Sequence, residues 1–428
     1  MSRPDSTPDP NDQFPTPRPA GIAVTAALLI TLALQNAVPP LSTDMYAPAF
    51  PQMTSELATT SAVVGLTLTT FFLGFGSGQI VGGAVSDQIG RRRPMIAGGI
   101  LALAGSIACA LSPTIGLILV GRFFQGFGGG VAAAVGRAIL VDVAHGNVLA
   151  RTMSLLQAIG GFAPMLAPIA GGLIVTHWPW RAVFWCLAAF TLVMSAAAWR
   201  WAPESLPPER RHSGGLPRFF HGLGRVMRIR GFVAFMATNV FVGFTMFGYI
   251  ANATYVFQQQ LGLSPLAFSW VFAANALLST LMALVNIRLI GRFEPRSLIV
   301  FGLSLAAGGV AVLAVATFAL DQSLLATELG FAMIMTATSF IFGNSGALSL
   351  GHAREHAGTA SAVQGLVQSL ANGLASPLAT SGGAVTAVPM VCVMIVGIVG
   401  AWLSFAILAR MGRLPGPEGP GAPGEIGA

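Results

Sequence analysis

Long apolar stretches, broken by short polar segments, recur along the whole chain of 428 residues. Each stretch holds about 18 or more residues with few charges, the length at which an α-helix crosses a bilayer core about 30 Å thick. We predict twelve membrane-spanning helices, at 21–47, 60–84, 94–112, 115–141, 152–176, 180–201, 231–257, 265–290, 297–319, 323–350, 357–380 and 385–410. The pattern therefore predicts an all-α polytopic membrane protein.

The longest polar segment runs from Pro203 to Arg230 and divides the predicted spans into two groups of six. An arginine cluster follows the second span of the first group and, as a weak echo, the second span of the second group. Paired six-helix repeats are typical of transporters that rock around a site at the membrane midplane. We therefore predict two pseudo-symmetric six-helix bundles at 21–201 and 231–410, a linker at 202–230, and disordered tails at 1–20 and 411–428.

The composition excludes an ordinary soluble protein, because 54% of the residues are hydrophobic and only 9% are charged, against about 25% charged in soluble domains. All 22 basic residues are arginines; the predicted inner segments hold nineteen of them and the outer segments hold only Arg181. The positive-inside rule then predicts that both termini are cytoplasmic. The net charge of +7 is scattered over loops, so we predict no nucleic-acid partner. The three cysteines lie in apolar spans and indicate packing rather than disulfides.

Arg122 lies inside the fourth predicted span, where a charge costs at least about 2.5 kcal/mol and therefore needs a partner. The first span delivers Asp44 to its outer end, and Arg122 lies about two turns below the outer end of its own span. An acid that shares an arginine with a proton can exchange one for the other. We predict that Asp44 and Arg122 form a proton-coupling pair. The alternative for Asp44 is a solvated cap at the helix end.

For two further charged residues, the sequence allows two roles each. Arg137 follows Arg122 by fifteen residues, about 60° around the helix, so it either faces the same cavity or binds Asp142 or lipid headgroups. Glu328 lies near the outer end of the tenth span and is either a second proton site or a solvated helix-end residue.

Polar side chains recur on single helical faces in the second half, for example at Tyr249 and Asn252, and at Gln364 and Gln368. Such faces either bind neighbouring helices or line a cavity beside aromatic residues such as Phe247. We predict a substrate cavity for amphipathic compounds of varied shape. Its candidate residues are Tyr46, Gln125, Arg137, Tyr249, Asn252, Asn275, Gln364 and Gln368.

The segment between the second and third spans reads GAVSDQIGRRR. It resembles the GxxxDxxGRR(K/R) loop of the major facilitator superfamily, with Gly83, Asp87, Gly90, Arg91, Arg92 and Arg93 in register. The resemblance implies the major facilitator fold, glycines that allow a tight turn and close packing, and a relay of charges that holds the outward-facing state. Gln88 stands where the family usually has Arg or Lys. The segment from Arg122 to Gly126 likewise resembles the RxxQG element of that superfamily.

The fifth predicted span contains small residues and two prolines, a pattern that permits close helix contact and a bend. It resembles the antiporter motif of drug:proton exchangers, carried here by Gly161, Pro164, Pro168, Gly171 and Gly172. Ala163 replaces the glycine that usually precedes the first proline. With the segment around Asp44, this makes the chain similar to bicyclomycin-resistance (Bcr/CflA) type efflux proteins.

These features predict a proton-coupled multidrug efflux transporter of the bacterial inner membrane, acting as a monomer, and not an enzyme. No GxxxxGK[ST] motif is present, so we expect the proton gradient rather than ATP or a cofactor to supply the energy. His352 to His356 matches a zinc-binding pattern, but it lies in a short loop without an evident third ligand, and we predict no metal. An uptake symporter or uniporter, or a non-transporting receptor or scaffold, are the alternatives.

Overall fold

The computed structural model describes residues 24–144, 146–211, 222–320, 322–353, 357–383 and 385–410, all of which form helices and their connections. The predicted tails at 1–20 and 411–428 lie outside the described residues. So do the middle of the predicted linker and His356 of the zinc-like pattern.

Twelve long helices occur among the described residues, one at each predicted span. The first half contains α1 (Ala26–Asp44), the short α2 (Phe50–Glu56), α3 (Ser61–Ile89), α4 (Arg92–Leu111), α5 (Ile115–Val143), α6 (Gly146–His177) and α7 (Arg181–Trp201). The second half contains α9 (Arg230–Thr254), α10 (Pro265–Leu289), α11 (Pro295–Phe318), α12 (Leu324–His352), α13 (Ala357–Ala379) and α14 (Val388–Arg410). In the described part of the chain, ten helices are long and apolar enough to cross a membrane. The predicted fold class is thereby confirmed.

Two boundaries differ from the prediction in ways that matter for the site. Helix α3 continues to Ile89 rather than ending at 84, so Asp87 is helical and the turn is confined to Gly90 and Arg91. Helix α1 ends at Asp44 rather than at 47. The chain then enters a 3₁₀ turn, η2 (Ala47–Ala49), and then α2.

Helices α3 and α5 pack almost backbone to backbone. A Cβ atom placed on Gly78 would lie 2.9 Å from the carbonyl carbon of Phe127, and one on Gly126 would lie 2.9 Å from that of Phe71. Real Cβ atoms do not approach so closely, so only glycine fits at both contacts. The glycine run that begins at Gly126 is therefore a helix-packing face, as small residues in membrane helices usually are.

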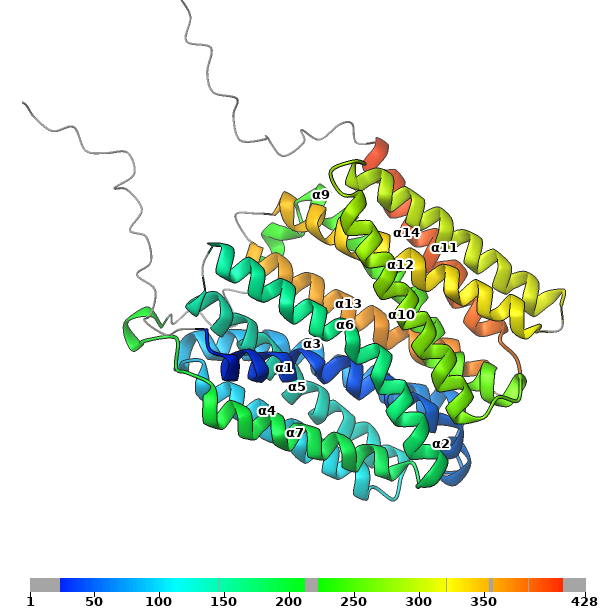
Figure 1. Ribbon diagram of the computed structural model, residues 1–428, viewed down its shortest axis with the longest axis horizontal. Coiled ribbons are helices and arrows are strands. Elements are labelled where there is room, and N and C mark those ends of the chain that lie inside the picture. Colours follow the sequence, from blue (N-terminus) through cyan, green and yellow to red (C-terminus); the bar gives the residue numbers. More distant parts are fainter. Residues whose placement is uncertain are drawn as a thin grey trace, which may run out of the picture.

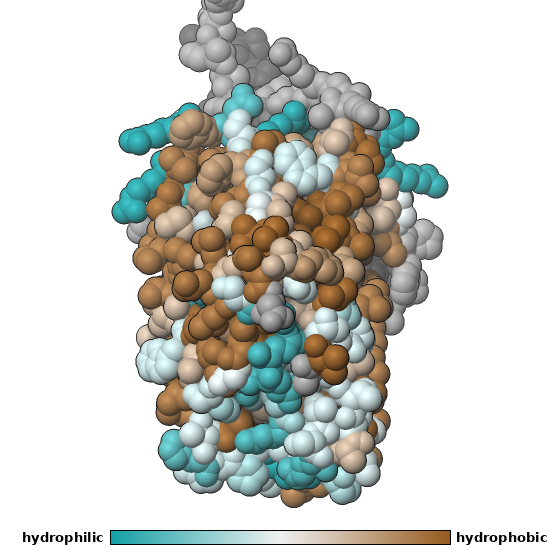
Figure 2. Space-filling model, turned by 90° about the vertical axis from the view of Figure 1, so that its right-hand side faces the viewer, coloured by the Kyte–Doolittle hydropathy of each residue, from teal (hydrophilic) through white to brown (hydrophobic). Residues whose placement is uncertain are grey.

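Both described chain ends lie at the same end of the molecule (Figure 1). We call this the terminal end, where α1 begins and α14 ends, and the other the distal end, where α1 ends and α3 begins. The blue-to-green helices of the first half lie below the green-to-red helices of the second half in Figure 1. Figure 2 shows hydrophobic residues over most of the upper half of one face, with hydrophilic residues at its upper edges and lower centre. A broad apolar flank of this kind is suited to lipid.

Candidate functional site

A cavity of about 1500 Å³ lies between the two halves and is lined by α1, α3, α6, α9, α10, α12 and α13. Asp44, Phe72 and Phe272 line its deep part, and Ile290 and His352 line it close to the terminal end. Most of the wall is apolar, with amide side chains set into it. The cavity therefore reaches from the terminal end to the end of α1, at the level of Asp44.

Beyond Asp44 the two halves close on each other at the distal end. Thr54 of α2 hydrogen-bonds the Tyr255 hydroxyl at 2.7 Å, and Thr254 donates to the Ala47 carbonyl at 3.0 Å. The Gln258 amide also donates to the Pro48 carbonyl at 3.3 Å. Tyr255 begins η4 (Tyr255–Gln260), a short π-helix, a form often found at functional positions. We call these contacts the distal closure.

A second line of contacts extends this closure along α3 and α13. Ser376 donates to the Gly65 carbonyl at 2.8 Å, and Thr69 donates to the Gly373 carbonyl at 2.6 Å. Ser61 at the start of α3 donates to the Thr380 carbonyl at 2.6 Å. These bonds join the halves through backbone carbonyls, so the seam depends on close helix approach rather than on charge.

Asp44 is almost completely buried, with 5% of its surface exposed, and it lies on the cavity wall. Its Oδ1 accepts a hydrogen bond of 2.7 Å from the neighbouring Thr43 hydroxyl. Among the described residues, no arginine nitrogen lies within 4.0 Å of it. A buried acid without a basic partner is costly when charged, so this position favours the exchange of a proton over a permanent charge.

The ion pair expected between Asp44 and Arg122 is not present in this structure. Arg122 is fully buried, and its guanidinium lies 4.6 Å from the ring centre of Tyr46 and 4.5 Å from that of Phe71. Its Nη1 donates to Gln125 at 2.5 Å and its Nε to the Thr67 carbonyl at 3.3 Å, while Nη2 has no partner among the described residues. Aromatic faces and neutral oxygens hold this charge. Arg122 thus contacts Tyr46, two residues after Asp44, rather than Asp44 itself, because helical depth does not specify which way a side chain points.

The predicted cavity residues do not line the cavity. Tyr46 and Gln125 surround Arg122 instead, and Tyr249, Asn252 and Asn275 are buried within the second half. Gln364 and Gln368 lie in α13 but outside the cavity wall, where Gln368 donates to Asn372 at 2.8 Å. Arg137 is exposed and forms no described ion pair, and its alternative partner Asp142 binds Arg91. In the described part of the chain, none of the eight predicted residues lines this cavity.

On α9 the cavity uses a different face from the one that carries Tyr249. Phe247 lines it and Tyr249 does not, because two residues correspond to about 200° around an α-helix. The aromatic signal at Phe247 and the amides at Asn286 and Asn372 were visible in the sequence, and all three line the cavity. Helical periodicity shows that polar residues lie on one face of a helix. It does not show whether that face contacts another helix or the cavity.

The motif in α6 lies where the two halves meet. Pro164 lines the cavity, and Pro164 and Pro168 are both inside the helix. A Cβ on Gly171 would lie 2.7 Å from the carbonyl carbon of Met45, and one on Gly172 would lie 2.8 Å from the Cβ of Ser269 in α10. Gly171 therefore packs directly behind Asp44, and Gly172 packs across to the second half. The surroundings of Gly161 lie outside the described residues.

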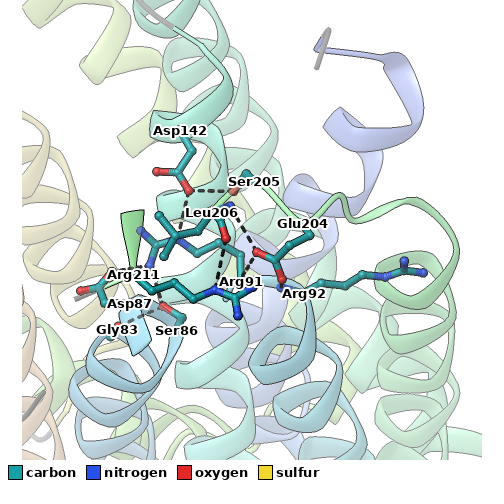
Figure 3. Close-up of polar contacts among 10 residues, drawn as sticks. All are labelled: Gly83, Ser86, Asp87, Arg91, Arg92, Asp142, Glu204, Ser205, Leu206 and Arg211. Carbon is teal, nitrogen blue, oxygen red and sulfur yellow. Dashed lines mark hydrogen bonds and ion pairs between the residues drawn. The ribbon is translucent and has the colours of Figure 1, made fainter. Parts of the chain in front are cut away.

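The residues of the Gly83–Arg93 segment form a polar cluster at the terminal end (Figure 3). Arg91 is buried and donates to Asp87 at 2.5 Å, to Asp142 at 3.0 Å and to Ser86 at 2.8 Å. Burial alone would lower the pKa of Arg91, but the hydrogen bonds and charges of Asp142 and Asp87 outweigh it and raise that pKa. Asp142 also accepts from Ser205 at 2.7 Å. Each of these contacts stays within the first half.

Glu204, in the segment after α7, caps the start of α4. Its carboxylate accepts from the backbone N–H of Arg91 at 2.8 Å and of Arg92 at 3.3 Å. Gly90 has a φ of +97°, and a Cβ there would meet the Glu204 carboxylate, so glycine is needed at this turn. By contrast, nothing lies within 4 Å of a Cβ on Gly83. The expectation of close packing at Gly83 is wrong. For Arg93 the structure gives only its place in the first turn of α4.

Glu204→Ala is expected to lower the stability of the folded protein by about 1 kcal/mol, because a carboxylate that caps a helix start is lost. The measurement is thermal unfolding in detergent. Glu209→Ala removes an exposed acid that is close in sequence and is expected to have little effect. Equal midpoints for the two variants would contradict a capping role.

The amino-acid sequence is similar to those of known proteins. The sequence model of the Major Facilitator Superfamily matches residues 32–376. The uncharacterized MFS-type transporter YdgK of Bacillus subtilis (strain 168) is 31% identical over 383 residues, covering 89% of this chain and 94% of that protein. The multidrug resistance protein MdtL of Shewanella oneidensis is 29% identical over 334 residues, covering 77% of this chain and 82% of that protein.

Solved structures agree in fold. A D-xylose-proton symporter superimposes with a TM-score of 0.70 at 16% identity, covering 88% of this chain and 96% of that one. A partially occluded inward-open structure of the xylose transporter XylE from E. coli gives a TM-score of 0.71 at 15% identity, covering 89% and 97%. At these identities the likeness concerns the arrangement of helices alone.

Proposed function

Because the chain belongs to the major facilitator superfamily, whose model matches most of its length, we propose that it is a proton-coupled exporter of small amphipathic compounds, of the drug:proton antiporter type. The observation that carries the proposal is the position of Asp44. This acid lies at the deep end of the cavity, directly before the segment that forms the distal closure, and no described arginine pairs with it. The similarity to MdtL multidrug resistance proteins supports the same substrate class.

The wall chemistry favours amphipathic substrates. Phe72, Phe247 and Phe272 offer flat apolar surfaces around the deep part of the cavity, and Asn286 and Asn372 offer hydrogen bonds. Sites with few fixed polar groups on a large apolar wall accept compounds of varied shape. With the terminal end cytoplasmic, as the arginine distribution predicts, the cavity in this structure faces the cell interior.

Proton binding at Asp44 is coupled to opening of the distal closure because only a short chain segment separates the two. Tyr46 covers the Arg122 guanidinium, and the next residue, Ala47, accepts a bond from the second half. Loss of the Asp44 proton creates a negative charge two residues from a ring that shields an unpartnered guanidinium nitrogen. Attraction between the charges would draw Asp44 toward Arg122, move Tyr46 and loosen the closure. Protonation from outside would restore it.

The test is transport by purified protein in liposomes that contain a pH-sensitive dye. Addition of ethidium is expected to drive protons in the direction opposite to ethidium, with a rate that depends on the amount of protein. Ethidium movement without proton movement, or movement of both in the same direction, would contradict antiport.

The direction of transport separates export from uptake. Cells that overproduce the protein are expected to accumulate less ethidium or chloramphenicol than cells with an empty vector. Greater accumulation would favour the uptake alternative, and no change with either compound would favour another substrate class.

A further inference from the structure

The second half contains a half-buried acid that the proposed coupling at Asp44 does not use. Glu328 lies in the second turn of α12, and its Oε1 accepts a hydrogen bond of 2.9 Å from the Asn275 amide of α10. Its Oε2 is shielded from solvent and has no partner among the described residues. An ionised carboxylate is strongly disfavoured when one of its oxygens is shielded from water and accepts no hydrogen bond. A protonated carboxyl is neutral and needs only one hydrogen-bond acceptor for its proton.

A buried tyrosine lies close to this carboxylate. Tyr249 of α9 is fully buried between Phe331, at 4.2 Å between ring centres, and Phe272, at 5.6 Å. Phe331 is three residues from Glu328 on α12, and Phe272 is three residues from Asn275 on α10, so each pair shares a helical face. Glu328 and Asn275 of the second half, and Asp44 of the first half, are the polar neighbours of the tyrosine. Its hydroxyl also has no partner among the described residues.

No charge of the second half competes for this site. The charged or titratable side chains on the helices packed around Glu328 are Arg230 of α9, Arg288 of α10, Arg296 of α11 and His352 of α12. All four lie at the terminal end of their helices, whereas Glu328 lies at the distal end. Among the described residues, no basic nitrogen is within 4.0 Å of its carboxylate.

We propose that Glu328, with Asn275 and Tyr249, forms a second proton-binding site in the second half, separated from the cavity by the Phe272 side chain. The proton resides on Oε2, the oxygen without a partner among the described residues, while Asn275 holds Oε1. Phe272 lines the cavity and stacks on the Tyr249 ring, so a substrate that displaces it alters the packing around the Glu328 carboxyl. One acid then serves each half, and a full cycle exchanges two protons. This inference rests on the proposed antiport.

The first test reads the proton site without transport. Dicyclohexylcarbodiimide reacts with protonated carboxyl groups in apolar surroundings, and the modified residue is located by mass spectrometry. At about pH 7 an ordinary glutamate is almost fully ionised. Labelling is therefore expected at Glu328 and not at Glu294, which is exposed, and Asn275→Ala is expected to change the pH at which labelling is lost. Absence of label on Glu328 at about pH 7 would overturn the proposal.

The second test counts protons. The membrane potential that halts exchange is measured in liposomes at a fixed pH gradient, and it is expected to give two protons per substrate for the native protein and one for Glu328→Gln. Glu294→Gln serves as the matched control and Glu328→Asp as the conservative variant; both should keep two. An unchanged ratio in Glu328→Gln would overturn the proposal. If the native protein moves no protons, the antiport proposal fails, and labelling alone decides the site.

Discussion

Asp44→Asn is expected to abolish the coupling between substrate and protons while the protein stays folded. Asparagine keeps the size of the side chain and can accept the Thr43 hydrogen bond, but it cannot bind and release a proton. Substrate-driven proton release should fall by at least about tenfold, within the usual range of coupling free energies of about 1–3 kcal/mol. The measurement is proton movement on addition of ethidium in liposomes, with thermal unfolding in detergent as the check on folding.

The matched control is Asn36→Ala. Asn36 also belongs to α1 and lines the cavity, but it carries no exchangeable charge. This variant is expected to keep the native number of protons per substrate even if its rate is lower. If Asp44→Asn exchanged at the native rate and ratio, the assignment of the coupling proton to Asp44 would have to be abandoned.

Gly78→Ala is expected to be among the most destabilising single-residue changes in the first half. The added Cβ would press on the backbone of Phe127, which a side-chain movement cannot relieve. Overpacking of this kind costs about 1–3 kcal/mol and more where backbone must move. The measurement is the midpoint of thermal unfolding in detergent, together with the yield of monodisperse protein.

Gly83→Ala is the control on the same helix. Its Cβ would meet nothing within 4 Å, and alanine is a better helix former than glycine. The variant is expected to match or slightly exceed the native midpoint. Equal losses from both substitutions would mean that α3 is sensitive to any glycine replacement rather than to its contact with α5.

The helices could be predicted from the sequence because each one must form its own backbone hydrogen bonds in lipid. A lipid-embedded helix therefore needs a long apolar stretch, which local hydropathy detects. The extension of α3 to Ile89 was missed because Ser86 and Asp87 look like loop residues, yet Arg91 and its partners hold them in a helical turn.

The site was harder to predict because it depends on side-chain direction. Asp44 was identified, and it does line the cavity. Its expected partner Arg122 instead contacts Tyr46 and Phe71, which no spacing rule anticipates. Tyr249 and Asn252 share a face, as predicted, but that face packs inside the second half, whereas the neighbouring Phe247 meets the cavity.

The π-helical turn at Tyr255–Gln260 has a mechanical consequence. A π-turn accommodates one residue more than an α-turn, so rewinding it to α geometry turns the residues beyond it by about 100° relative to the rest of α9. The Tyr255 hydroxyl can then leave Thr54 through a local change of winding, without translation of a whole helix through lipid. Opening at the distal end can thus begin with this local change of winding, before the two six-helix halves separate.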